Sequence, residues 1–184
     1  MIGQTGIWTT EESDYGHAFS YYTARFIGRY FEKNRPVIDL GCGNGTYLQY
    51  LKDIGFENLT GVDGCKVSKP DFEDIQIIDL AQPINVGKGN VLSLEVFEHI
   101  PPMYERQFVQ NIINACDDKL VLSVAVEGQG GIGHVNCKNN DYIINLFSEN
   151  GFSFKDGLTD AIRTDVEPHV MYFKNTLMIF EKIK

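Results

Sequence analysis

The chain has 184 residues, of which 43% are hydrophobic and only 6 are proline, and its formal net charge is -9. This composition is typical of one soluble domain and excludes collagen-like and disordered chains. A chain of this length buries enough surface to fold without a disulfide or a structural metal. Because Lys and Arg supply most of the affinity for a phosphate backbone, the acidic charge disfavours nucleic acid as a partner.

Hydropathy and cysteine spacing set the expected compartment. The sequence has no run of about 18 apolar residues, and its first eight residues carry no basic or apolar leader, so we expect a cytoplasmic protein that does not enter a membrane. The four cysteines lie far apart and form no CxxC spacing, which predicts reduced, structural thiols.

Short apolar segments alternate with amphipathic ones along most of the chain. Apolar residues recur every fourth position over residues 14–32, which predicts a helix before the first strand. The expected strands cover residues 37–40, 59–62, 75–78, 90–95 and 120–126, and the expected helices cover residues 46–54, the segment after Pro101 and Pro102, and residues 141–150. Repeated strand–helix units imply a parallel sheet with helices on both faces. We expect a single domain over residues 1–184.

The last part of the chain has a different pattern. Residues 151–155 and 171–181 each favour a strand, and a short helical stretch at residues 158–163 separates them. A late pair of strands without a long helix between them indicates an antiparallel hairpin at the edge of the sheet.

A glycine-rich turn follows the first predicted strand. The residues are Asp39-Leu40-Gly41-Cys42-Gly43-Asn44-Gly45, and glycine there lets the backbone turn sharply and approach a ligand. A dinucleotide fingerprint needs glycine at the sixth position, where this chain has Thr46. The carboxylate of Asp39 would also repel a diphosphate and attract a cation.

Two further acids follow the next two strands. Asp63 ends the second strand, where a carboxylate can accept hydrogen bonds from ribose hydroxyls. Asp79 ends the third strand, where it could meet an adenine amino group while Leu80 covers the ring. A ligand that combines adenine, ribose and a cationic amino-acid tail fits all three acids, and that ligand is S-adenosylmethionine.

These segments resemble the class I S-adenosylmethionine-dependent methyltransferases. The matching stretches are residues 37–45, 61–63 and 92–101, and residues 122–136 and 172–178 resemble a subgroup of small bacterial and viral methyltransferases. The resemblance implies an α/β, Rossmann-like three-layer sandwich. Its seven-stranded, mostly parallel sheet has the order 3-2-1-4-5-7-6, with strand 7 antiparallel.

The resemblance also implies roles for individual residues. It implies that Asp39 and the glycine turn bind the methionine portion of the cofactor, that Asp63 binds the ribose, and that Asp79 with Leu80 binds the adenine. Methyl transfer would convert this cofactor to S-adenosylhomocysteine. Glu95 would border the methyl-donor cavity, and an N-terminal helical segment, residues 1–35, would cover the site. The expected cofactor-binding residues are Asp39, Gly41, Cys42, Gly43, Asn44, Asp63, Gly64, Asp79, Leu80 and Glu95.

Two histidines are the candidates for catalysis. His134 lies in a glycine-rich segment after the fifth strand, which is typical of a substrate-facing loop, and it could act as a base, a substrate ligand or a loop-ordering residue. His99 follows the fourth strand and could act as a base or shape the cavity. Glu95, Glu98 and His99 could suggest a metal. We expect none, because adjacent residues on one short segment rarely point at one ion and no second ligand set is evident.

Residues of the first helix have two possible roles. Tyr15, His17 and Tyr22 could close over the donor, whereas the spacing of Phe19, Tyr22 and Phe26 favours a buried stripe. His169 is expected on the surface.

The sequence therefore predicts methyl transfer to an oxygen or nitrogen atom of a small-molecule or glycan acceptor. Three alternatives stay open: a module that binds the donor or a partner without turnover, an NAD(P)-dependent oxidoreductase, and a nucleic-acid methyltransferase. The sequence does not identify the acceptor or the oligomeric state.

Overall fold

The computed structural model describes residues 2–8 and 18–184 of the chain. The strands are β1 (Val37–Leu40), β2 (Leu59–Asp63), β3 (Ile75–Ile77), β4 (Gly89–Leu94), β5 (Cys116–Ser123), β6 (Phe152–Phe154) and β7 (Leu177–Lys182). The α-helices are α2 (Tyr21–Tyr30), α3 (Thr46–Asp53), α4 (Glu105–Ala115), α5 (Asn140–Glu149), α6 (Asp156–Thr164) and α7 (Phe173–Thr176). Short 3-10 helices cover Phe97–His99 (η1), Pro102–Tyr104 (η2) and Pro168–Val170 (η3).

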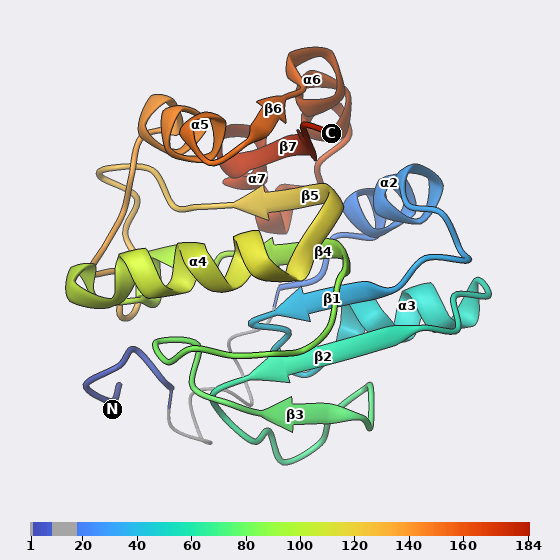
Figure 1. Ribbon diagram of the computed structural model, residues 1–184, viewed down its shortest axis with the longest axis horizontal. Coiled ribbons are helices and arrows are strands. Elements are labelled where there is room, and N and C mark those ends of the chain that lie inside the picture. Colours follow the sequence, from blue (N-terminus) through green and yellow to red (C-terminus); the bar gives the residue numbers. More distant parts are fainter. Residues whose placement is uncertain (1, 9–17) are drawn as a thin grey trace.

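All seven strands form one sheet in the order β3-β2-β1-β4-β5-β7-β6 (Figure 1). Strands β1 to β5 pair in parallel, and β7 runs antiparallel between β5 and β6. The predicted fold class and strand order are confirmed. The order reverses at β1, which lies between β2 and β4, and ligands of open α/β sheets bind at such a point, beyond the carboxyl ends of the strands.

Helices cover both faces of the sheet (Figure 1). The sheet therefore separates the hydrophobic core into two layers. Alternate residues of a strand point to opposite faces. Ile38 therefore belongs to the buried cluster that includes Phe108 of α4 and Phe147 of α5, whereas Val37 belongs to the cluster that includes Ile27 of α2 and Leu51 of α3. Apolar side chains fill both layers, and this fixes the register that brings the strand ends to one edge.

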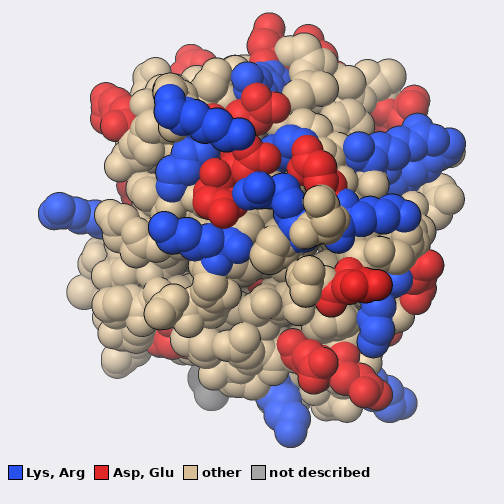
Figure 2. Space-filling model, turned by 45° about the vertical axis from the view of Figure 1, so that its right-hand side comes forward, with Lys and Arg blue, Asp and Glu red and all other residues tan. Residues whose placement is uncertain are grey.

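The edge where the parallel strands begin carries paired charges. Arg35 pairs with Asp117, Lys119 with Glu32, and Lys155 with Glu181. Figure 2 shows basic and acidic side chains interspersed on this face, so it presents no single-sign basic surface. Among the described residues, no helix is both long enough and apolar enough to span a bilayer.

The structure corrects several predicted boundaries. Within the described residues the first helix starts at Tyr21, because the Ser20 side chain accepts a hydrogen bond from the amide of Thr23 and caps it. Strand β5 occupies residues 116–123 rather than 120–126, because its polar first residues still pair with β4 and β7. Residues 171–176 are largely helical instead of extended, since Phe173 turns into the core, and β7 begins at Leu177.

The N-terminal residues do not form the predicted helix over their described part. Residues 2–8 fold into a turn in which Ile2 and Trp8 form an isolated antiparallel bridge. Residues 14–17 of the predicted first helix lie outside the described residues. The predicted buried stripe is wrong at Tyr22, which is 47% exposed, because Ala24 and Ile27 form the buried face of α2.

Asn111 of α4 holds the segment after β3 in place. Its buried amide nitrogen donates to the carbonyls of Leu80 (2.9 Å) and Gln82 (2.8 Å), and its oxygen accepts from the amide of Ile84 (3.3 Å). Removing the Asn111 side chain is costly to stability, because the buried backbone groups that it bonds then lose their hydrogen bonds.

We predict that Asn111→Ala destabilises the chain by about 2–4 kcal/mol, measured by urea unfolding, because it leaves buried backbone groups unpaired. The matched control is Asn114→Ala on the same helix, since the exposed side chain of Asn114 accepts a hydrogen bond from the side chain of Gln110 and from no other described residue. Equal losses in both variants would show that Asn111 has no special role.

Candidate active site

A cavity of about 880 Å³ opens at the carboxyl ends of β1, β2 and β4. This volume lies in the usual range for small-molecule and cofactor sites. All the residues predicted to bind the cofactor line it except Gly43, and both candidate catalytic histidines line it as well. The cavity therefore joins the predicted donor end to the predicted catalytic end.

The glycine turn adopts a backbone that only glycine tolerates well. Gly41 and Gly45 have φ values of 84° and 79°, and a Cβ on Gly41 would collide with Val96. The amides of Gly41 and Cys42 both donate to the carbonyl of Val62, which ties the turn to β2. The backbone consequently passes close to the cavity wall.

Asp63 organises the turn from the end of β2. One carboxylate oxygen accepts the amide of Gly43 (2.8 Å), and the other accepts the amide of Cys65 (2.8 Å). Gly43 thus serves the site through its amide, although it does not line the cavity. A carboxylate oxygen can accept more than one hydrogen bond, and the ribose role predicted from the sequence requires this of Asp63.

Asp39 places a buried carboxyl group in the same region. It is only 3% exposed, and its pKa is raised well above the usual value, first by burial and then by the charge of Asp63. A bound cation would reverse the charge effect and favour the ionised carboxylate. The geometry therefore fits the cationic ligand predicted from the sequence and opposes a diphosphate.

The segment after β3 forms the opposite end of the donor region. The Asp79 carboxylate accepts the amide of Ala81 (2.9 Å), and the largely buried Leu80 lines the cavity. The Asn111 side chain fixes the Leu80 carbonyl from behind. This rigid edge is the expected position for the adenine ring.

Glu95 lies at the end of β4 in a strained backbone conformation. Its φ is 53°, which is uncommon for a residue other than glycine, and its amide donates to the Ser123 hydroxyl (2.8 Å). One carboxylate oxygen accepts the side-chain amide of Gln129 (3.0 Å), and the other is buried without a hydrogen-bond partner among the residues that the structure describes. Gln129 begins the loop that carries His134, so this bond links the loop to β4.

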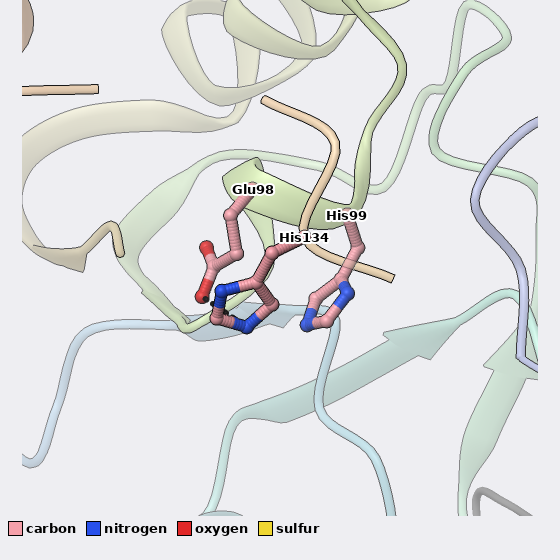
Figure 3. Close-up of side chains that lie close together, drawn as sticks. All are labelled: Glu98, His99 and His134. Atoms are coloured by element: carbon pink, nitrogen blue, oxygen red, sulfur yellow. Dashed lines mark ion pairs between the residues drawn. The ribbon is translucent and has the colours of Figure 1, made fainter. Parts of the chain in front are cut away.

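The structure brings His99 and His134 together, as Figure 3 shows. Their ring centroids lie 5.0 Å apart, and His134 Nε2 lies 4.0 Å from a carboxylate oxygen of Glu98. Burial, followed by the charge of His134, lowers the pKa of His99 to about 4, so its imidazole is neutral at pH 7.

The backbone of Glu98 explains how His134 reaches this position. The Glu98 carbonyl accepts the amides of Val135 (2.9 Å) and Asn136 (3.0 Å), which fastens the end of the long loop to η1. The expectation that no second ligand set adjoins Glu98 and His99 is therefore wrong, because Glu98, His99 and His134 form a cluster able to hold a metal ion. No pattern near residue 134 could have revealed a contact made across this distance in the sequence.

Other predicted residues have different outcomes. Tyr15 and His17 lie outside the described residues, and Tyr22 does not line the cavity. His169 is on the surface, as predicted, with its Nε2 2.9 Å from the carbonyl of Phe19. Residues 5–8, within the N-terminal segment expected to cover the site, line the cavity, and Trp8 lies edge-on against His99, although neither contact was predicted residue by residue.

The strand order, the glycine turn and the acids at three strand ends define the class I S-adenosylmethionine-dependent methyltransferase fold. Comparison with known families is consistent with this class. The methyltransferase-domain family matches residues 14–124, and the chain belongs to that family.

Individual relatives are more distant. EEF1A lysine methyltransferase 2 of Danio rerio is 32% identical over 93 residues, which cover 50% of this chain and 38% of the relative, so the chain spans well under half the length of that protein. A TehB-like S-adenosylmethionine-dependent methyltransferase of Corynebacterium glutamicum superposes with a TM-score of 0.66 at 18% identity, covering 95% of this chain and 93% of the other. The 1,6-didemethyltoxoflavin-N1-methyltransferase of Burkholderia thailandensis, solved with S-adenosylhomocysteine bound, gives a TM-score of 0.60 at 14% identity, covering 89% and 77%.

We predict that Asp63→Asn weakens S-adenosylhomocysteine binding about 10- to 100-fold in calorimetric titration. An amide cannot accept from both the Gly43 and Cys65 backbones, so the variant loses order in the turn as well as its ribose contact. Asp53→Asn is the control, because Asp53 is exposed on α3 and its side chain bonds Gln49 alone among the described residues. Unchanged affinity in Asp63→Asn would refute the assigned role.

Proposed function

We propose that this chain transfers a methyl group from S-adenosylmethionine to an oxygen or nitrogen atom of a small-molecule or glycan acceptor. The observation that carries the proposal is the continuous cavity, which has the Asp39, Asp63 and Asp79 carboxylates at one end and the two histidines at the other. Aligning a donor with an acceptor at contact distance is the main catalytic task in such a displacement.

The donor end fits S-adenosylmethionine on electrostatic grounds. Asp39 would face the cationic amino-acid portion, Asp63 the ribose hydroxyls, and Asp79 with Leu80 the adenine. When bound, this cofactor supplies a methyl group on a positively charged sulfur. Because the glycine turn is held by Val62 and Asp63, the chain needs little reorganisation to receive it.

The acceptor end offers two imidazoles with free lone pairs. The Nδ1 atom of His134 lies 3.2 Å from the carbonyl of Gln129, which only accepts hydrogen bonds, so the proton belongs on Nδ1 and the lone pair on Nε2. Neutral His99 offers a second lone pair in the same region. These groups can receive the acceptor's proton or bind what positions the acceptor.

Two alternatives from the sequence are weaker on this structure. A nicotinamide dinucleotide would bring a diphosphate to the buried Asp39, at an electrostatic cost. A binding module without turnover would not need the histidine pair, and measurement of turnover separates it from an enzyme.

We predict that the purified chain transfers radiolabel from methyl-labelled S-adenosylmethionine to a component of a dialysable metabolite extract. His134→Ala should reduce the rate at least about tenfold, whereas His169→Ala should leave it unchanged. Labelling of only the macromolecular fraction would contradict a small acceptor, and donor binding without any labelling would favour the non-catalytic module.

We also predict that S-adenosylmethionine binds more tightly as the pH rises toward the raised pKa of Asp39. Because the pKa of Asp39 is raised in the free protein, binding a cation below that pKa requires release of a proton, and affinity can change by up to about tenfold per pH unit. Asp39→Asn should remove this dependence. The neutral analogue 5′-methylthioadenosine, which lacks the amino-acid tail, should show little of it, and equal slopes for both ligands would contradict the role of Asp39.

A further inference from the structure

We propose that Glu98, His99 and His134 bind a divalent transition-metal ion at the acceptor end of the cavity. Each residue offers one ligand atom, and these atoms lie within 4.8 Å of one another (Figure 3). Bonds of about 2.0–2.2 Å from a central ion place its ligand atoms roughly 3–4 Å apart, so small side-chain rotations would close the site.

The burial of the Glu98 carboxylate is the main observation that favours a bound cation. Its side chain is completely buried, and neither oxygen has a hydrogen-bond partner of ordinary geometry among the described residues. A buried carboxylate without compensation is costly, and proteins resolve it with a proton, a counter-charge or a metal. In the described part of the chain, the only basic side chain within ion-pair distance is His134, at 4.0 Å.

Glu95 adds a second acidic side chain to the same region. One of its carboxylate oxygens is buried and has no hydrogen-bond partner among the described residues. A dication bound at Glu98 would also be attracted by the charge of Glu95.

The two histidines are oriented as metal ligands usually are. Nδ1 of His134 lies 3.2 Å from the carbonyl of Gln129, and Nδ1 of His99 lies 3.3 Å from the carbonyl of Gly133. A proton on each Nδ1 satisfies these carbonyls and leaves each Nε2 lone pair for an ion, the arrangement that fixes metal-bound imidazoles in other proteins. The indole of Trp8 approaches His99 Nδ1 at 3.4 Å and would stabilise the other tautomer, so metal binding would select between the two.

The donor set defines the class of ion. Imidazole nitrogens suit Zn²⁺, Co²⁺, Mn²⁺ and Fe²⁺, whereas Mg²⁺ and Ca²⁺ prefer sites made of oxygen alone. Two imidazoles and one carboxylate leave coordination positions open toward the cavity. On the proposed function, those positions would bind oxygen atoms of the acceptor and orient it, so the acceptor class is one with adjacent oxygen donors, such as a vicinal diol or a catechol.

The test is calorimetric titration of the untagged, chelator-treated chain with Zn²⁺, Mn²⁺ and Mg²⁺, without cofactor or acceptor. We predict binding of about one Zn²⁺ or Mn²⁺ per chain, weaker binding of Mg²⁺, and an increase in Tm on addition of Zn²⁺. His134→Ala and Glu98→Gln should each lower the affinity at least about tenfold, and His169→Ala should not change it.

Titration with Co²⁺ gives an independent spectroscopic readout, because nitrogen ligation produces visible absorption that His134→Ala should diminish. No binding by the wild-type chain, or equal binding by the wild type and both site variants, would overturn the proposal. S-adenosylhomocysteine affinity is measured on the same samples: if it is intact while metal binding is absent, the metal site fails and the proposed function stands. If the metal binds and the cofactor does not, the proposed function fails instead.

Discussion

The site depends on how the fold holds negative charge at the carboxyl ends of β1 and β2. Asp63 is stabilised by two backbone amides, and in return it fixes the glycine turn. Among the described residues, the effects on Asp39 disfavour its ionised form, namely burial and the charge of Asp63. The protein therefore supplies compensation for one carboxylate and leaves the other to be neutralised by a ligand. This asymmetry selects for positive charge at the donor end, and it arises from two strand ends that parallel pairing keeps side by side.

A second acidic centre lies at the other end of the same cavity. Glu95 and Glu98 follow β4, and both present buried carboxylate oxygens that have no hydrogen-bond partner in the described part of the chain. The backbone strain at Glu95 fits this interpretation, because strained residues persist where the surrounding structure holds them for a functional reason. The two centres differ in their neighbours: glycine amides surround the first and imidazoles the second. The same kind of charge can thus serve a cationic cofactor at one end and a metal ion at the other.

The sequence predicted the features that depend on local pattern. Short apolar segments located β1 and β2, and the glycine turn with Asp39, Asp63 and Asp79 located the cofactor end of the cavity. Predictions failed where pairing across the sheet outweighs local character, as in β5, which begins at Cys116 although polar residues follow it. The contact of His134 with Glu98 was also beyond reach, because it depends on backbone hydrogen bonds from residues 135 and 136 to η1. These bonds involve groups that every residue carries, so no side-chain pattern encodes them.

The anchoring of this loop constrains the acceptor. Gln129 is bonded to Glu95 at the start of the loop, and the backbone after His134 is bonded to Glu98 at its end, so both ends are attached to the segment after β4. Residues 2–8 pack on the same region, with Trp8 against His99 and Ile2 against Gly133. The wall around the histidines is therefore built from three chain segments that contact one another. An acceptor must fit within what the cofactor leaves of a cavity of about 880 Å³, and this is why a small molecule or a single extended side group suits the site better than a folded surface.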